Sequence, residues 1–331
     1  MKNILIIHTG GTFGMVPQKP APTLAPGQVQ ERITKYVPEL EQIANIDFRA
    51  VCNLDSANIT PHHWQTLAKL IFENIARYDG FVIIHGTDSM VYTAAALSFM
   101  LRNLPKPVIL TGSQRPLAEI RTDARMNLIN AVELATHDIP EVGIFFGTEL
   151  FRGNRAVKIS GIDYGAFISP NCSPLAEVGL EVRIKNHHLK PTGAFRLLPE
   201  ISDEVLAIPF FPGLQTAYLD WLKNSPLRAL VIQGLGMGNV ATQEKSLVPL
   251  VRELTQAGKL IVITSQSRHG FVDLSRYENG KLIADAGAIG ANDMTTEATI
   301  VKLMHLFGTY PNTLSTVKSK LHQSLAGEIS E

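Results

Sequence analysis

The sequence lacks a surplus of charge of either sign. Its 30 lysine and arginine residues balance 30 aspartate and glutamate residues, and it contains no polybasic block. A protein that binds nucleic acid or an anionic membrane needs a positively charged surface to meet the phosphate groups. We therefore expect neither a nucleic acid nor a membrane as a partner, and a small or neutral molecule instead.

Cysteines and long apolar runs are also scarce. Cys52 and Cys172 are too few for a disulfide framework or a metal cluster, and we interpret both as reduced thiols. Only four strongly apolar residues lie between Asn3 and His8, too few for a secretion signal. No segment approaches the roughly 18 apolar residues of a membrane-spanning helix. These absences predict a cytoplasmic protein.

Apolar residues make up 45% of the 331 residues, enough for one large or two ordinary hydrophobic cores. Short, continuous β-branched runs are typical of strands covered on both faces. They occupy residues 4–8, 81–85, 107–112, 141–147, 229–234 and 259–265. Helix-like stretches lie between them at residues 62–78, 92–104, 123–137 and 246–258. This alternation predicts an α/β fold whose parallel strands bind a ligand at their carboxyl ends.

A domain boundary is expected in the second half of the chain. Residues 189–204 mix charge, Pro and Gly without a helical period, and a new strand starts at Val205. We expect an N-terminal domain over residues 1–188, a linker over 189–204 and a C-terminal domain over 205–331. The Pro-rich residues 15–28 cannot form a helix interior or a central strand, and we expect a loop that closes over a site.

Small and polar residues follow the first two predicted strands. "HTGGT" occupies residues 8–12 and "HGTDS" residues 85–89. The glycines of the first segment suggest a phosphate-binding loop, but the G-x-G-x-x-G spacing and the G-K-[ST] motif are absent. Taken alone, Thr12 could be an ordinary turn residue, and Thr87, Asp88 or Ser89 could cap the helix that follows. Two threonines at one crevice instead favour nucleophilic chemistry, which needs a nearby base.

Five segments that occur in this order together resemble the bacterial L-asparaginases, and among them the cytosolic type I branch. They are "TGGTFGM", "DGFVIIHGTDSM", "PVILTGSQRPL", "FRGNRAVK" and "GAIGANDMTTEATIVK", and the match extends to about residue 326. The resemblance implies a two-domain α/β fold, with a larger, mostly parallel N-terminal sheet flanked by helices and a smaller C-terminal α/β domain. It also implies hydrolysis of L-asparagine to L-aspartate and ammonia, with no cofactor and no metal ion.

The resemblance further implies four catalytic residues, Thr12, Thr87, Asp88 and Lys158. Thr12 matches the family's nucleophile, whereas Thr87 would aim the attacking water or serve as the alternative nucleophile. Lys158 must be neutral to act as a base, which burial favours and a neighbouring Asp88 opposes. We therefore expect Asp88 also to bind the α-ammonium group of the substrate. The alternative for Lys158 is an exposed lysine at the end of a strand.

The pocket for a free amino acid must satisfy both a carboxylate and an ammonium group. The resemblance implies that the substrate-binding residues are Gly11, Asp55, Ser56, Gly86, Ser113 and Asn239. We expect Ser56 to bind the α-carboxylate, because Asp55 would repel it unless Asp55 serves the ammonium group. Ser113 would offer a backbone group to the side-chain amide, and an N–H group of Gly86 or Thr87 would bind the oxyanion.

Asn239 is expected to reach the active site of a neighbouring subunit, which implies a homodimer or a dimer of dimers. The alternative is a turn asparagine. Relatives usually carry a tyrosine that bonds to the first threonine in the loop after "TGGT", and residues 13–35 contain none. Activation of Thr12 therefore needs another proton acceptor, or catalysis is slower, or Thr87 takes over. Gln233 replaces an arginine that several cytosolic relatives use at an effector site, so control by asparagine is only weakly indicated.

Three further segments have simpler interpretations. His85 is expected to orient backbone rather than carry a proton. "EIRTDAR", residues 119–125, is expected to tie a loop down through ion pairs. Asp293 or Thr295 is expected to cap a helix at residue 296. Two rival functions stay open, namely the amidase component of a tRNA-dependent transamidation system, which usually has an extra N-terminal domain, and a weakened amino-acid binding protein.

Overall fold

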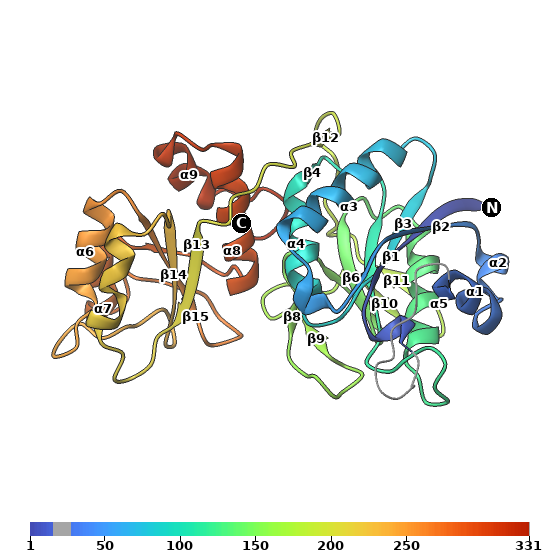
Figure 1. The fold of residues 1–331 in the computed structure, drawn as a ribbon, viewed down its shortest axis with the longest axis horizontal. Coiled ribbons are helices and arrows are strands. Elements are labelled where there is room, and N and C mark those ends of the chain that lie inside the picture. The colour runs from blue at the N-terminus through green and yellow to red at the C-terminus, as the bar shows by residue number, and fades with distance from the viewer. Residues whose placement is uncertain (16–27, 331) are drawn as a thin grey trace. The chain divides into compact units, whose positions relative to one another are not determined.

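The computed structural model describes residues 1–15 and 28–330, which fold as two units, Met1–Pro199 and Glu200–Glu331 (Figure 1). The division falls within residues 189–204, the predicted linker. The loop predicted for residues 15–28 lies almost entirely outside the described residues, so its closure stays a prediction.

An eight-stranded mixed sheet forms the centre of the N-terminal unit, in the order β11-β10-β7-β6-β5-β3-β1-β2. Strands β2, β1, β3, β5 and β6 run parallel, and β7, β10 and β11 extend the sheet in antiparallel pairs. The bounds are β1 (Lys2–Gly10), β2 (Ala44–Leu54), β3 (Gly80–Ile84), β5 (Val108–Thr111), β6 (Val142–Phe146), β7 (Glu149–Arg152), β10 (Ala176–Val178) and β11 (Val182–Ile184). This arrangement confirms the predicted fold of the larger domain.

Helices cover both faces of this sheet (Figure 1). The described helices are η1 (Thr12–Gly14), α1 (Gln28–Tyr36), α2 (Leu40–Ile43), η2 (Ser56–Asn58), α3 (Pro61–Asn74), α4 (Met90–Met100) and α5 (Ala124–Ala135). Helices α1, α2 and α5 pack on the face that includes Ile4 and Ile6, and α3 and α4 lie on the other face. Because side chains alternate along a strand, strands with continuous apolar runs supply both cores.

Two short antiparallel pairs lie beside the large sheet. Strand β4 (Leu101–Arg102) pairs with β12 (Arg196–Leu197), and β8 (Val157–Lys158) pairs with β9 (Phe167–Ile168). A two-residue turn at Gly147 and Thr148 joins β6 to β7, and Gly147 has a φ of 67°. Positive φ suits a tight hairpin, and glycine adopts it without steric cost. The hairpin reverses the chain and leads it toward β8, which carries Lys158.

A parallel four-stranded sheet in the order β13-β14-β15-β16 forms the centre of the C-terminal unit. Its elements are β13 (Val205–Pro209), η3 (Thr216–Asn224), β14 (Ala229–Gly234), α6 (Val248–Gln256), β15 (Leu260–Ser265), α7 (Glu278–Asp285), β16 (Ile289–Gly290), α8 (Thr296–Thr309) and α9 (Leu314–Leu321). Helices α6 and α7 cover one face of the sheet, and α8 and α9 cover the other. This confirms the predicted smaller α/β domain.

Buried charge in the C-terminal unit is concentrated at one ion pair. Lys302 Nζ lies 2.6 Å from Glu328 Oε1, and both side chains are 0% exposed. The same nitrogen donates to the carbonyl oxygens of Leu321 and Gln323, at 2.8 and 2.7 Å. The Glu328 carboxylate accepts from the backbone N–H of Leu325 and Ala326. The chain after α9 is therefore tied to α8 by one charged cluster.

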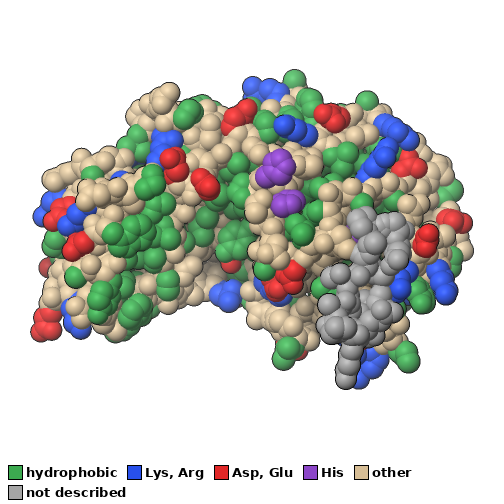
Figure 2. Space-filling model, viewed as in Figure 1, with side chains coloured by type: hydrophobic (Ala, Val, Ile, Leu, Met, Phe, Trp, Pro, Cys, Tyr) green, Lys and Arg blue, Asp and Glu red, His purple; other side chains and the backbone are tan. Residues whose placement is uncertain are grey.

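The surface carries both signs of charge. On the face in Figure 2, lysine and arginine side chains are interspersed with aspartate and glutamate side chains, without a continuous area of one sign.

Within the part of the chain that the structure describes, no helix combines the length and apolar character needed to cross a membrane.

Candidate active site

The tips of two neighbouring parallel strands meet at one edge of the N-terminal sheet. His8 of β1 is in register with Ile84 of β3, so "HTGGT" and "HGTDS" begin side by side. Gly11 has a φ of 84°, and a Cβ atom built on it would lie 2.5 Å from Cα of Gly86. A Cβ atom on Gly86 would in turn lie 2.7 Å from Ser56 Oγ. Only glycine at both positions permits this contact, which brings three predicted site residues, Gly11, Ser56 and Gly86, together.

Lys158 lies against the second of these tips. Its Nζ atom is 2.7 Å from Thr87 Oγ1 and 2.5 Å from Asp88 Oδ1. The Lys158 side chain is 16% exposed, whereas that of Asp88 is 69% exposed. Lys158 is therefore not an exposed strand-end lysine. The pair combines a shielded ammonium group with a carboxylate that solvent, or a ligand, can reach.

Helix capping does not account for the polar residues of "HGTDS". Helix α4 begins at Met90, and its N-cap residue Ser89 makes no capping bond through its side chain. Ser89 Oγ instead donates to the carbonyl oxygen of Ser56 at 2.6 Å. Because Asp88 pairs with Lys158, its carboxylate faces a cation rather than the helix end. The capping interpretation of this segment is wrong.

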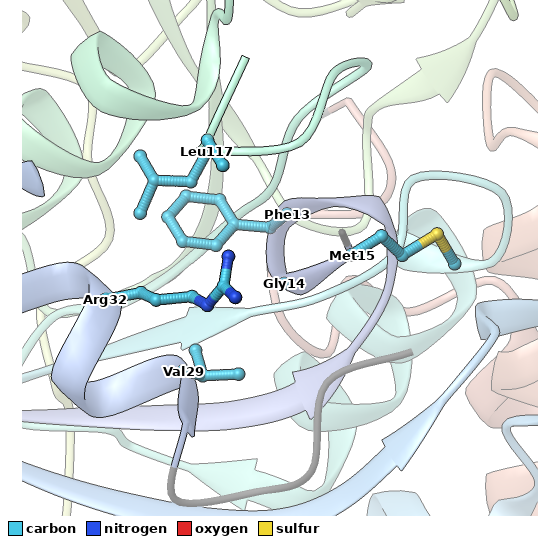
Figure 3. Close-up of a pocket in the computed structure, with 7 residues that line it drawn as sticks. Phe13, Gly14, Met15, Val29, Arg32 and Leu117 are labelled. Atoms are coloured by element: carbon cyan, nitrogen blue, oxygen red, sulfur yellow. The ribbon is translucent and has the colours of Figure 1, made fainter. Parts of the chain in front are cut away.

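Thr12 begins the short helix η1, which Gly11 alone separates from β1. Its neighbour Phe13 is 1% exposed, and the carbonyl oxygen of Phe13 accepts from Leu117 N at 3.1 Å. Figure 3 shows the Phe13 ring beside Leu117, with the Arg32 guanidinium near it. The pocket in Figure 3 is lined by Phe13, Gly14, Met15, Val29, Arg32, Leu117 and Ala118. Phe13 therefore anchors the turn that presents Thr12.

His85 is held by hydrogen bonds at both ring nitrogens. Its Nδ1 lies 2.7 Å from the carbonyl oxygen of Gly86, which can only accept, so Nδ1 carries the proton. Thr93 Oγ1 lies 2.9 Å from Nε2 and accepts from Trp64 Nε1 at 3.0 Å. Thr93 can thus donate to an unprotonated Nε2. Burial lowers the pKa of His85 to about 4, which agrees with a neutral ring that orients backbone.

The remaining predicted substrate-binding residues differ in their surroundings. Ser56 is buried. Asp55 is exposed, and its Oδ1 accepts from Ala57 N at 2.9 Å, which caps η2. Ser113 is buried and its Oγ donates to the carbonyl oxygen of Arg115 at 2.6 Å. Asn239 belongs to the C-terminal unit, where it closes a turn through two backbone bonds of 2.8 Å to Leu235.

Gln114 is a site residue that the sequence reasoning missed. Its Oε1 lies 3.5 Å from Thr87 Oγ1, and its Nε2 donates to the carbonyl oxygens of Ser160 and Asp163, at 3.3 and 3.1 Å. The available signal was its place in "TGSQRP", directly after Ser113 at the end of a strand.

A metal centre is not supported by the side chains near this edge. Over residues 1–15 and 28–330, no three His, Cys, Asp or Glu side chains are grouped as metal ligands would be.

Comparisons with known proteins agree with these motifs over nearly the whole chain. Residues 3–190 match the family "Asparaginase, N-terminal", and residues 204–318 match "Glutaminase/Asparaginase C-terminal domain". The chain is 38% identical over 334 residues to L-asparaginase 1 of Escherichia coli (strain K12). The aligned region covers 99% of this chain and 98% of that protein. The chain belongs to the L-asparaginase family.

Two solved L-asparaginase structures share the fold. The thermostable L-asparaginase from Thermococcus kodakarensis matches with a TM-score of 0.91 at 34% identity, covering 99% of each chain. L-asparaginase I from Vibrio cholerae matches with a TM-score of 0.90 at 36% identity, covering 100% of this chain and 99% of that one. The predicted family, its type I branch and the two-domain fold are confirmed, and the protein is an L-asparaginase-type amidohydrolase.

Proposed function

We propose that this protein hydrolyses the side-chain amide of L-asparagine to L-aspartate and ammonia, using Thr12, Thr87, Asp88 and Lys158. The observation that carries this proposal is the Lys158 ammonium group, which lies within hydrogen-bond distance of both Thr87 Oγ1 and Asp88 Oδ1. It is supported by the contact between Gly11 and Gly86, because Thr12 and Thr87 directly follow these two glycines.

The reaction takes place in two steps. The Thr12 hydroxyl oxygen gives up its proton and bonds to the carboxamide carbon, the C–N bond breaks, and the nitrogen takes up that proton and leaves as ammonia. An N–H group of Gly86 or Thr87 stabilises the oxyanion that forms on the way. Water then attacks the resulting ester, and its proton passes by way of Thr87 to Lys158. The ester C–O bond breaks, Lys158 returns this proton to the Thr12 oxygen, and aspartate leaves. Thr87 is the alternative nucleophile.

Lys158 can accept a proton only when it is neutral, and the carboxylate of Asp88 favours the charged form. The α-ammonium group of the substrate resolves this conflict if it binds to the exposed side of Asp88. The positive charge of this ammonium group offsets the negative charge of the Asp88 carboxylate, and this favours proton loss from Lys158 in the complex. Asp88 thereby acts both in binding and in the chemistry.

Ser56 binds the α-carboxylate in this proposal, and a backbone group at Ser113 faces the side-chain amide. The buried Ser56 hydroxyl is available for an anionic group, whereas the Asp55 carboxylate already accepts from Ala57 N. We assign Asp55 to the structure of η2 and to the rim of the pocket.

Ammonia release from L-asparagine and L-glutamine tests this function. The wild type should release ammonia from L-asparagine, and Thr12→Ala, Thr87→Val and Lys158→Met should each lower the rate at least about 100-fold. Thr66→Ala and Lys69→Met, on the outer surface of α3, are matched controls that should keep full activity. Binding of L-aspartate without any ammonia release by the wild type would indicate an amino-acid binding protein instead.

We also propose a cytoplasmic homodimer, or a dimer of dimers, in which Asn239 completes the site of the partner subunit. Mixing Thr12→Ala subunits with Asn239→Ala subunits tests this idea. If Asn239 acts across the interface, the mixed dimer contains one intact site, and activity returns on mixing. No recovery in a mixture shown to exchange subunits would contradict the shared site.

A further inference from the structure

The carboxylate of Asp123 binds the backbone of the loop that follows strand β5. Its Oδ2 accepts from Gln114 N at 2.9 Å, and its Oδ1 accepts from Arg115 N at 3.1 Å. Asn127 Nδ2 donates to the same carboxylate at 3.2 Å. Three N–H donors thus converge on one acidic side chain.

Helix capping does not explain this arrangement. Asp123 occupies the N-cap position of α5, where a carboxylate ordinarily accepts from the first turn of the helix. Asp123 makes no such bond. Thr122 Oγ1 accepts from Ala124 N at 3.0 Å instead. With the cap supplied by Thr122, the Asp123 carboxylate turns back toward residues 112–117.

This loop touches the three segments that carry the proposed catalytic residues. Leu117 N donates to the carbonyl oxygen of Phe13, which follows Thr12. Gln114 Oε1 lies 3.5 Å from Thr87 Oγ1. Gln114 Nε2 donates to the carbonyl oxygen of Ser160, two residues after Lys158. A displacement of residues 112–117 would therefore reach all three segments.

Asn127 fixes the other end of the loop. It is 2% exposed, and its Nδ2 donates to the carbonyl oxygen of Gly112 at 3.0 Å. Its Oδ1 accepts from Gly147 N at 3.2 Å, at the turn between β6 and β7. Asp123 and Asn127 thus attach the loop to the first turns of α5 and to the central sheet.

We propose that Asp123 is a positioning residue, which holds residues 112–117 so that Thr12, Thr87 and Lys158 keep their reactive geometry. This inference rests on the proposed function. The carboxylate is required because it only accepts hydrogen bonds, and its two oxygens face only donors. An asparagine at this position would remove the negative charge that strengthens these bonds, and would turn an NH₂ group toward either Arg115 N–H or the Asn127 amide.

The decisive variant is Asp123→Asn, which keeps the size of the side chain. We expect kcat per L-aspartate-binding site to fall at least about tenfold, since a lost hydrogen bond to a charged group has effects of this order. The affinity for L-aspartate should change less than about threefold, because Ser56 and Asp88 hold the α-groups. Hydrogen exchange of the amides in residues 113–117 should become at least about tenfold faster.

Counting binding sites separates positioning from folding, because misfolded protein lowers the number of sites and not the rate at each site. The matched control is Asp79→Asn, since Asp79 Oδ2 also accepts a backbone N–H, from Asn3 at 2.9 Å. Asp79 lies at the amino end of β3, away from the strand tips, and its variant should leave both kcat per site and the exchange of residues 113–117 unchanged.

Unchanged exchange of residues 113–117 in Asp123→Asn would overturn the inference, and so would an unchanged kcat per site. A wild type that releases no ammonia would refute the proposed function. Hydrogen exchange of residues 113–117 would then still decide whether Asp123 holds this loop.

Discussion

Gly11 and Gly86 are in backbone contact, so that a methyl group on Gly11 would lie 2.5 Å from Cα of Gly86. Gly11 cannot gain a side chain without separating the two strand tips, whereas a Cβ atom on Gly86 would lie 2.7 Å from Ser56 Oγ. We expect Gly11→Ala to lower the rate of ammonia release at least about 100-fold, because Thr12 and Thr87 would move apart.

Gly258→Ala is the matched control for this change. Gly258 has a φ of 81°, close to the 84° of Gly11, but a Cβ atom on it would meet nothing within 4 Å. The alanine there should cost about 1–2 kcal/mol of backbone strain and leave activity intact. Full activity in Gly11→Ala would show that contact between the tips is not needed.

The exposed carboxylate of Asp88 should discriminate between substrates with and without an α-ammonium group. Succinamic acid is asparagine without that group. We expect the wild type to prefer L-asparagine, and Asp88→Asn to reduce this preference roughly 10- to 100-fold in kcat/KM, as expected for the loss of a charged hydrogen bond. Asp220→Asn, which alters another aspartate paired with a lysine, should leave the preference unchanged. If kcat/KM of Asp88→Asn fell equally for both substrates, Asp88 would act in the chemistry alone.

Two buried histidines should make the N-terminal unit sensitive to acid. Burial lowers the pKa of both His8 and His85 to about 4, whereas an unfolded histidine titrates near about 6.5. Between these values the unfolded chain binds more protons, so the free energy of unfolding falls as the pH drops. The expected loss between about pH 7.5 and about pH 5 is roughly 2 kcal/mol per histidine.

Denaturant titrations at these two pH values measure that loss. His85→Gln should be less stable than the wild type at the higher pH, since it disturbs the bonds to Gly86 and Thr93, but it should lose less on acidification. His62→Gln, at an exposed position of α3, should keep the full pH dependence. If the free energy of unfolding of His85→Gln fell on acidification by as much as that of the wild type, His85 would not be the group that takes up the proton.

The buried pair of Lys302 and Glu328 should dominate the stability of the C-terminal segment. Lys302→Met leaves the Glu328 carboxylate buried without its cation, and we expect a cost of about 3–5 kcal/mol. Hydrogen exchange in α8 and α9 measures this cost. Glu253→Gln, which breaks an exposed pair with Lys223, should leave the exchange in these helices nearly unchanged. Equal effects of the two changes would contradict a special role for burial.

The sequence predicts the parallel core and the strand tips because both follow from local patterns. Continuous β-branched runs predict β1, β3, β5, β6, β14 and β15, and the glycines and threonines after β1 and β3 mark where the chain leaves the sheet. Thr295 caps α8 as expected, its Oγ1 accepting from Ala298 N, whereas Asp293 accepts from Ser330 N. Site residues can therefore be predicted from the sequence where they directly follow the end of one predicted strand.

Elements with weak local patterns were not predictable. Strand β2 lies at the edge of the sheet, and its charged residues Asp47 and Arg49 alternate with apolar ones in a run too mixed for a buried strand. Strands β7 to β11 have two to four residues each, too few to show a period.

Contacts between segments that lie far apart in the sequence could not be predicted either. The ion pair expected in "EIRTDAR" does form, between Arg115 and Glu119 at 2.6 Å, but the Asp123 carboxylate binds backbone instead. Nothing in the order of residues shows that Gln114 meets both Thr87 and the carbonyl oxygen of Ser160, because this depends on how three loops converge.

The unequal shielding of Lys158 and Asp88 has a consequence for the range of molecules that the enzyme can process. If Asp88 binds the α-ammonium group as we propose, the substrate must carry a free α-amino group, and an asparagine within a polypeptide has none. Proteins in the same compartment would keep their asparagine side chains, and the enzyme would draw only on the pool of free amino acids.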